Sequence, residues 1–221
     1  MTKLEILAQD IELGHAQAVC RTIRELLGEG VPPDDILRLG LMPGLQTVGE
    51  KFEAQEYFIP EMLRAARASK LGTELLRGSL PQGASVTGKK MVLGTVRNDL
   101  HDIGKNLVAM AVEGMGIGVV DLGVDVSAEQ FVAAAERDPT VVLVGVSALL
   151  TTTLPAMEQT VRALRACRAA GRIRIFVGGA PVTQELAGKY GADVYTDSAF
   201  EAARAARRII DEMESTPYAG V

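Results

Sequence analysis

The 221-residue chain contains no tryptophan, and aromatic residues make up only 4% of it. A surface that stacks on nucleic-acid bases needs aromatic side chains, so we expect none here. Basic residues are also in the minority, because 23 Lys and Arg stand against 28 Asp and Glu, for a formal net charge of -5. This balance argues against nucleic acid or an anionic membrane as the main partner.

Cysteine is scarce, and long apolar runs are absent. Cys20 and Cys167 lie far apart without the spacing of metal ligands, so we expect neither a disulfide framework nor a zinc site. No uninterrupted apolar run approaches the roughly 20 residues of a membrane-spanning helix. The first residues also lack the cationic start, apolar block and cleavage site of a signal peptide. We therefore expect a cytoplasmic protein without a membrane partner.

The first part of the chain has apolar residues at helical spacing, which predicts a bundle of four or five helices over residues 1–80. The pattern is carried by Leu4, Leu7, Ile11, Val19, Ile23, Leu26, Ile36, Leu37, Val48, Phe52, Ile59, Met62, Leu71 and Leu75. Residues 78–88 are rich in Gly, Pro and Ser and predict a linker.

After the linker, apolar strand patterns alternate with helical ones, which predicts an α/β unit over residues 89–214. Strands are expected at 90–96, 117–124, 141–146, 173–177 and 192–195, and helices at 103–115, from Ser127 onward, and at 154–170, 181–189 and 199–214. This order predicts a flavodoxin-like, doubly wound parallel sheet of five strands. Such folds bind ligands beyond the carboxyl ends of their strands.

The loop after the first predicted strand holds Asp99, His101 and Gly104. A neutral imidazole suits a borderline transition metal, and a nearby carboxylate commonly fixes such a ring and raises its basicity. Gly104 has no side chain, so another group could approach the backbone there. A polar loop or a helix cap would explain the same residues without any ligand.

Two further strand ends are expected to face the same crevice. The third strand is followed by a cluster of hydroxyl groups, and the fourth ends in adjacent glycines that allow close backbone approach. Helix caps and glycine turns are the structural alternatives for both. The candidates are Ser147, Leu149, Thr151, Thr153, Gly178 and Gly179.

The pattern Asp99-x-His101-x-x-Gly104, followed by Ser147-x-Leu149 and Gly178-Gly179, resembles that of cobalamin-binding domains. It is similar to the cobalamin module of methionine synthase. In size and layout the chain looks more like the small corrinoid proteins of methyltransferase systems that use methylamines, methanol, betaines or methoxylated aromatics. The helical part also matches, through the segment from Glu56 to Ala66.

The resemblance implies a role for each candidate. His101 would ligate cobalt from the lower face and displace the benzimidazole of the cofactor, Asp99 would hydrogen-bond that imidazole, and the Thr153 hydroxyl would complete the triad. Methionine synthase has Ser at the last position.

The other candidates would hold the displaced nucleotide tail or the upper face. Ser147 and Leu149 would line the tail pocket, and Gly104, Gly178 and Gly179 would leave room for the tail. Thr151 would be a further cofactor-binding residue. The bundle would cap the methyl-bearing face, with Tyr57 and Phe58 near it.

The implied function is a corrinoid carrier without a complete activity of its own. It would bind cobalamin, including methylcobalamin, in the base-off form with histidine on the cobalt. It would shuttle a methyl group between a substrate-specific methyltransferase and an acceptor methyltransferase, with a reductive activator as a further partner. The cap would swing away about the 78–88 linker.

Other functions use similar folds. A cobalamin-dependent sensor or regulator that lacks its own DNA-binding module is the main alternative. A mutase small subunit usually lacks a helical bundle in front of its cobalamin domain. A phosphoacceptor receiver needs an acidic residue where this chain has Ser147, and a flavodoxin needs a phosphate cradle that the first loop lacks.

Overall fold

A computed structural model describes residues 1–78 and 87–215 of the chain. The helical part comes first and consists of α1 (Lys3–Glu12), α2 (Ala16–Gly28), α3 (Pro33–Ile36), a π-helical turn (Leu37–Leu41), α4 (Met42–Glu53) and α5 (Ile59–Gly78). The predicted bundle is confirmed. Most of the predicted 78–88 linker lies outside the described residues, so its role as a hinge stays a prediction.

Local sequence signals explain where the first helices begin. The Thr2 hydroxyl accepts from the backbone N–H of Glu5, and the Glu5 carboxylate accepts from the backbone N–H of Thr2, which together cap α1. The chain continues from α3 through the π-helical turn into α4 without a break. Pro43 lies in the first turn of α4.

The α/β part contains the predicted parallel sheet, whose five described strands lie in the order β2-β1-β3-β4-β5. Its elements are β1 (Lys90–Thr95), α6 (Ile103–Gly114), β2 (Gly118–Asp121), α7 (Ala128–Arg137), β3 (Val141–Ser147), a 3-10 turn (Thr151–Thr153), α8 (Leu154–Ala166), β4 (Arg174–Gly178), α9 (Gln184–Tyr190), β5 (Val194–Tyr195) and α10 (Ala199–Ser215). The capping box expected at Ser127 and Gln130 is present.

Two predicted helices differ from the observed ones at their ends. The helix predicted over 154–170 ends at Ala166, because Cys167 adopts an extended conformation. The helix predicted over 181–189 begins only at Gln184, where the Thr183 hydroxyl accepts a hydrogen bond from the first turn. Among the described residues, no helix combines the length and apolar character that crossing a membrane requires.

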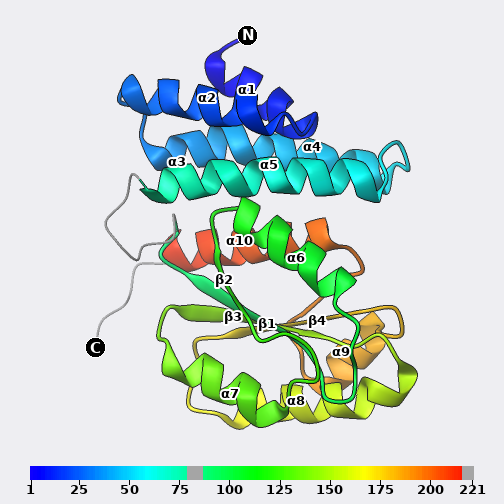
Figure 1. Ribbon diagram of the computed structural model, residues 1–221. Helices are drawn as coiled ribbons and strands as arrows, with labels where there is room; N and C mark the ends of the chain where they lie inside the picture. Colours follow the sequence, from blue (N-terminus) through cyan, green and yellow to red (C-terminus); the bar gives the residue numbers. More distant parts are fainter. Residues whose placement is uncertain (79–86, 216–221) are drawn as a thin grey trace.

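Each face of the sheet is covered by helices (Figure 1), with α6 and α10 on one side and α7 and α8 on the other. Alternate residues of β1 serve the two sides: Met91 and Leu93 belong to the core that includes α6 and α10, and Val92 belongs to the core beneath α7 and α8. The carboxyl ends of all the strands therefore open at one edge of this three-layer unit.

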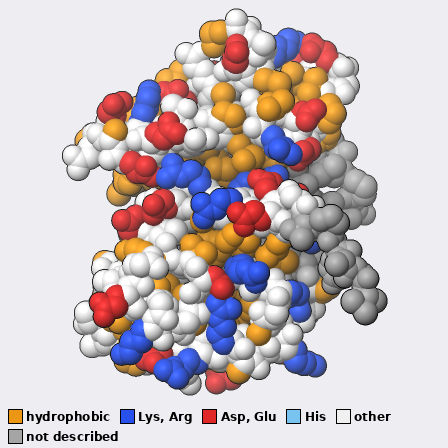
Figure 2. Space-filling model, turned by 180° about the vertical axis from the view of Figure 1, so that it is seen from behind, with side chains coloured by type: hydrophobic (Ala, Val, Ile, Leu, Met, Phe, Trp, Pro, Cys, Tyr) orange, Lys and Arg blue, Asp and Glu red, His pale blue; other side chains and the backbone are white. Residues whose placement is uncertain are grey.

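The helical bundle packs on α6 and α10 and shares their hydrophobic core. A Cβ at Gly114 would lie 2.8 Å from Leu45 Cδ1, so only glycine lets α6 approach the bundle this closely. The Ser69 hydroxyl donates to the Gly114 carbonyl at 3.0 Å, and Lys70 pairs with Glu113 at 2.7 Å. From behind (Figure 2), basic and acidic side chains lie together at mid-height, with hydrophobic side chains above and below.

Candidate functional site

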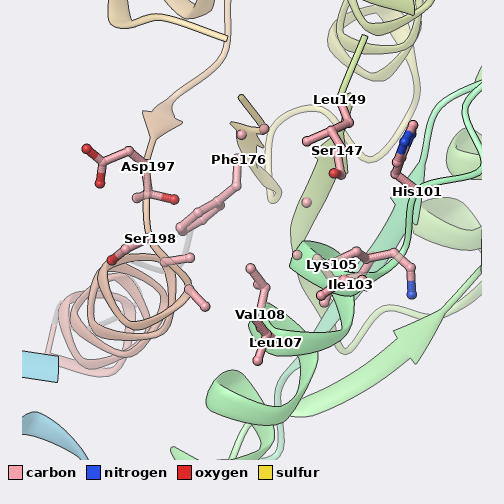
Figure 3. A pocket seen from close by; sticks show the side chains of 18 of the residues that line it. His101, Ile103, Lys105, Leu107, Val108, Ser147, Leu149, Phe176, Asp197 and Ser198 are labelled. Carbon is pink, nitrogen blue, oxygen red and sulfur yellow. The ribbon is translucent and has the colours of Figure 1, made fainter. Parts of the chain in front are cut away.

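A cavity of about 580 Å³ opens where the strands end, between the start of α6, the start of α10 and the loops after β3 and β4. Figure 3 shows side chains from these elements converging on it. The predicted residues that line it are His101, Gly104, Ser147, Leu149, Gly178 and Gly179. The crevice expected from the fold is therefore present.

Asp99 lies at the base of this site and is fully buried. One carboxylate oxygen, Oδ1, lies 2.8 Å from His101 Nδ1 and accepts from the His101 backbone N–H at 3.1 Å. The other, Oδ2, accepts from the Leu149 backbone N–H at 2.7 Å and from the Thr153 hydroxyl at 2.8 Å. A carboxylate is the one side chain here that can accept from four donors at once.

These contacts decide the charge of Asp99. Burial acts most strongly and favours the neutral acid, but the donors at Leu149, His101 and Thr153 together outweigh it and lower the pKa of Asp99 to about 2. Asp99 is therefore ionised at neutral pH. Because an ionised carboxylate only accepts, the Nδ1 atom that faces it must carry the proton, and the lone pair of the His101 ring lies on Nε2.

Hydrogen bonds hold both the side chain and the backbone of His101. Its side chain is half exposed and lines the cavity, with Nδ1 bound to Asp99. Its backbone carbonyl accepts from the hydroxyl of Thr95, a fully buried residue at the end of β1, at 2.8 Å. The ring is thus oriented by the protein while the nitrogen with the free lone pair, Nε2, makes no hydrogen bond to any described residue.

The two glycines at the carboxyl end of β4, Gly178 within the strand and Gly179 directly after it, have different reasons to be small. Gly179 has φ +125°, and a Cβ there would lie 1.9 Å from the Ala148 carbonyl oxygen, so no other residue fits. A Cβ at Gly178 would lie 3.0 Å from the Thr196 carbonyl oxygen. At Gly104 a Cβ would meet no atom within 4 Å, so this position faces open space in the cavity.

The remaining hydroxyl candidates lie in three different surroundings. Thr153 is buried and bonds to Asp99, as described, and its hydroxyl also lies 2.9 Å from the Leu150 carbonyl. Ser147 lines the cavity at the end of β3. Thr151 is exposed and is not among the residues that line the cavity, so its assignment to the cofactor stays a prediction.

Large apolar side chains are exposed around the mouth of the cavity. Leu100 is 72% exposed and Ile103 is 73% exposed, and Leu149 is also exposed. Exposed apolar groups gathered at a cavity mark a surface that an apolar ligand or partner covers. Deeper in the cavity lie Leu107, Val108 and Phe176, which sequence reasoning assigned only to helices and strands.

The helical bundle also reaches the cavity, through its α4–α5 end. Phe52, Ile59 and Met62 line it. Tyr57, which the sequence suggested, instead packs against the core and donates through its hydroxyl to Glu12 at 3.1 Å. Phe58 is 63% exposed and lies outside the cavity lining. The expected segment is therefore in place, but its neighbours rather than these two aromatics supply the lining.

Comparison with known proteins identifies the family of this chain. Residues 89–204 match a family model described as a B12 binding domain, and residues 4–77 match a second model with the same description. Both parts of the chain thus match models of cobalamin-binding domains. The chain belongs to the cobalamin-binding proteins, and cobalamin is its cofactor.

Individual relatives narrow the class. The chain is 38% identical over 180 residues to dimethylamine corrinoid protein 3 of Methanosarcina acetivorans, covering 81% of this chain and 84% of that protein. A cobalamin-binding protein from Desulfitobacterium hafniense DCB-2 has a similar structure, with a TM-score of 0.80, 28% identity, and 94% and 98% of the two chains covered. Within the class, this chain belongs to the small corrinoid proteins of methyltransferase systems.

A further similar structure comes from a complex with an enzyme. It is a chain of the methanol:cobalamin methyltransferase complex MtaBC from Methanosarcina barkeri, with a TM-score of 0.74, 28% identity, and coverage of 93% of this chain and 78% of that one.

Proposed function

We propose that this protein carries a methyl group on cobalamin, with His101 as the protein ligand of the cobalt and the benzimidazole of the cofactor displaced. It would take the methyl group from a substrate-specific methyltransferase and give it to an acceptor methyltransferase. Bound cobalamin supplies the cobalt centre that accepts and releases the methyl group.

The single observation that carries the proposal is the orientation of the His101 ring by a buried, ionised carboxylate. The Asp99 carboxylate accepts a hydrogen bond from the protonated Nδ1, which leaves the Nε2 lone pair available on the cavity side. Metal-bound imidazoles are commonly held in this way, because the second hydrogen bond fixes the tautomer and raises the basicity of the ligating nitrogen. A histidine that served only to cap a helix would need no such partner.

The cavity fits the rest of a corrinoid in its chemistry. Exposed Leu100 and Ile103 offer apolar surface at the mouth to the broad face of a macrocycle. Gly104 leaves open space beside His101, and Gly178 and Gly179 also line the cavity. Residues in the interior, including Ser147 and Leu149, would hold the displaced nucleotide tail.

Asp99 and Thr153 would also control how strongly the imidazole donates. The Thr153 hydroxyl helps the Leu149 and His101 donors to keep Asp99 charged. By accepting the hydrogen bond from Nδ1, the charged carboxylate would raise the electron density on Nε2. The protein would thereby favour the states of the cofactor in which the cobalt binds the His101 imidazole over the reduced state, in which it does not.

The names of similar proteins support the choice of partners. One relative is named a dimethylamine corrinoid protein, and one similar chain was solved in a complex with a methanol:cobalamin methyltransferase. We propose a methyltransferase for a small methylated compound as the donor, a second methyltransferase as the acceptor, and a reductive activator that restores oxidised cobalt. The cytoplasm is the compartment that suits these partners.

The ligand assignment is tested by reconstitution with cobalamin. The chain has only two histidines, so His15→Ala is a matched control for His101→Ala. His15 lies in the bundle, is mostly exposed, and pairs with Asp10 at 3.2 Å. We expect His101→Ala to lose the absorption spectrum of imidazole-bound, base-off cobalamin but to keep some cofactor, and His15→Ala to behave as wild type. An unchanged spectrum in His101→Ala would rule out this ligand.

The carrier role is tested separately. Methylated protein is incubated with purified candidate methyltransferases, and the loss of the methyl group is followed by the change in the absorption spectrum. Demethylation by one methyltransferase in the presence of its acceptor supports the proposal. If no methyltransferase tried demethylates the methylated protein, the carrier role is contradicted and the sensor is favoured instead.

A further inference from the structure

Lys105 is a buried charge that the proposed function leaves without a role. It lies in the first turn of α6, its side chain is only 2% exposed, and it belongs to the wall of the cavity. Figure 3 shows its amine turned away from the pocket, so it does not offer a charge to a ligand there. All three ammonium hydrogens have acceptors: Asp121 Oδ2 at 2.6 Å, Asp121 Oδ1 at 2.8 Å and Asn106 Oδ1 at 2.7 Å.

Neither position nor burial favours a cation at this point. The first turn of a helix carries the positive end of the helix dipole, which disfavours lysine. Removing a charge from water costs free energy that an ion pair often only just recovers, so a buried pair is weak evidence for stability. Fixing a geometry is a better explanation for the Lys105–Asp121 pair.

The geometry that the pair fixes is the backbone of the histidine loop. Asp121 ends β2, and its Oδ1 also accepts from the Gly123 backbone N–H at 2.8 Å. The Gly123 carbonyl in turn accepts from the Thr95 backbone N–H at 3.0 Å. The Thr95 hydroxyl donates to the His101 carbonyl at 2.8 Å. Since His101 precedes Lys105 by four residues, these bonds close a ring around the loop.

We propose that Lys105 and Asp121 are positioning residues for His101: by tying the start of α6 to the end of β2, they hold the His101 backbone where its Nε2 meets the cobalt. This inference rests on the proposed function. Asp99 orients the imidazole of His101. The hydrogen bonds that run from Lys105 through Asp121, Gly123 and Thr95 fix the position of the His101 backbone. Both are needed, because an imidazole displaced by an ångström would no longer reach the metal.

The test uses the cobalamin-loaded full chain, labelled with ¹⁵N-histidine and reduced to the paramagnetic cobalt(II) form. Nitrogen splitting in the electron paramagnetic resonance spectrum changes with the label only if histidine ligates the cobalt, and it measures the imidazole-bound fraction. We compare wild type with Lys105→Met, Asp121→Asn and the conservative Lys105→Arg. Lys90→Met is the matched control, because Lys90 pairs with Asp138 at 2.8 Å at the opposite end of β1.

We expect the ratio of imidazole-bound to imidazole-free cofactor to fall at least about tenfold in Lys105→Met and Asp121→Asn. We expect partial recovery in Lys105→Arg, whose guanidinium can still bind Asp121, and the wild-type ratio in Lys90→Met. Circular dichroism checks that each variant is folded. If Lys105→Met does not fold, Asp121→Asn alone tests the loss of the ion pair.

The outcomes separate the two proposals. Wild-type protein without a histidine-dependent splitting would overturn the proposed ligand and this inference with it. Wild-type splitting that is retained in full by Lys105→Met and Asp121→Asn would overturn only the positioning role. An equal loss in Lys90→Met would also overturn it, because any broken ion pair would then have the same effect.

Discussion

The hydroxyl of Thr153 makes the most testable contribution to the Asp99 cluster. It lies within hydrogen-bonding distance of two acceptors, Asp99 Oδ2 at 2.8 Å and the Leu150 carbonyl at 2.9 Å, but it has one hydrogen. The charged carboxylate is the stronger acceptor and takes it. Thr153→Val keeps the volume of the side chain and removes this bond alone.

The size of the effect follows from the charge of Asp99. A hydrogen bond to a charged group contributes about 1.5–3 kcal/mol. Removing it should therefore destabilise the apoprotein by about 2 kcal/mol near pH 7 and raise the pKa of Asp99 by one to two units at ~1.4 kcal/mol per unit. The wild-type pKa is about 2 against an ordinary 3.8. The stabilisation by Asp99 is thus complete above about pH 4 and is lost as the pH falls toward 2.

The assay is urea unfolding of the apoprotein near pH 7, pH 5 and pH 3. Thr160→Val is the matched control: Thr160 is also buried, and its hydroxyl donates to a neutral acceptor, the Ala156 carbonyl, at 2.8 Å. We expect Thr160→Val to cost about 1 kcal/mol or less at every pH. The reasoning is refuted if Thr153→Val costs no more than Thr160→Val near pH 7, or if its excess cost stays undiminished near pH 3.

Three glycine substitutions test the cavity and the packing of the bundle. Gly179→Ala places a Cβ 1.9 Å from the Ala148 carbonyl at φ +125° and should cost about 3 kcal/mol or more in urea unfolding, so a cost below about 1 kcal/mol would contradict the geometry. Gly104→Ala meets no atom within 4 Å, so stability should hold while cobalamin affinity, followed by absorbance titration, falls about tenfold. Unchanged affinity would mean that Gly104 does not border the cofactor. Gly114→Ala, 2.8 Å from Leu45 Cδ1, should cost about 1–3 kcal/mol by urea unfolding, and no cost would mean that the bundle packs loosely on α6.

Much of the fold could be predicted from the sequence because its signals are local. The capping box of Ser127 and Gln130 fixes the start of α7 within four residues of chain. The apolar run from Val141 to Val146 predicts a strand buried on both faces. One predicted helix end was wrong: Cys167 adopts an extended conformation inside the helix predicted over 154–170, which therefore ends at Ala166.

The sequence by itself determined the chemistry of the first loop: a single residue separates His101 from Asp99, and the backbone between them is short enough that Asp99 can reach His101 Nδ1. Only the tertiary structure supplied the distant donors that keep this carboxylate ionised and fixed in place. Its donors at Leu149 and Thr153 lie 50 and 54 residues away and arrive because β3 pairs with β1.

Tertiary packing also decided which residues surround the site. Phe52 and Met62 read as ordinary core positions of helices, and they line the cavity only because the bundle packs on α6 and α10. The Lys105–Asp121 pair spans 16 residues and forms where the start of a helix crosses the end of a parallel strand. Spacing along a chain fixes contacts within a turn or a strand, whereas these contacts depend on how distant elements lie against one another, which spacing does not encode.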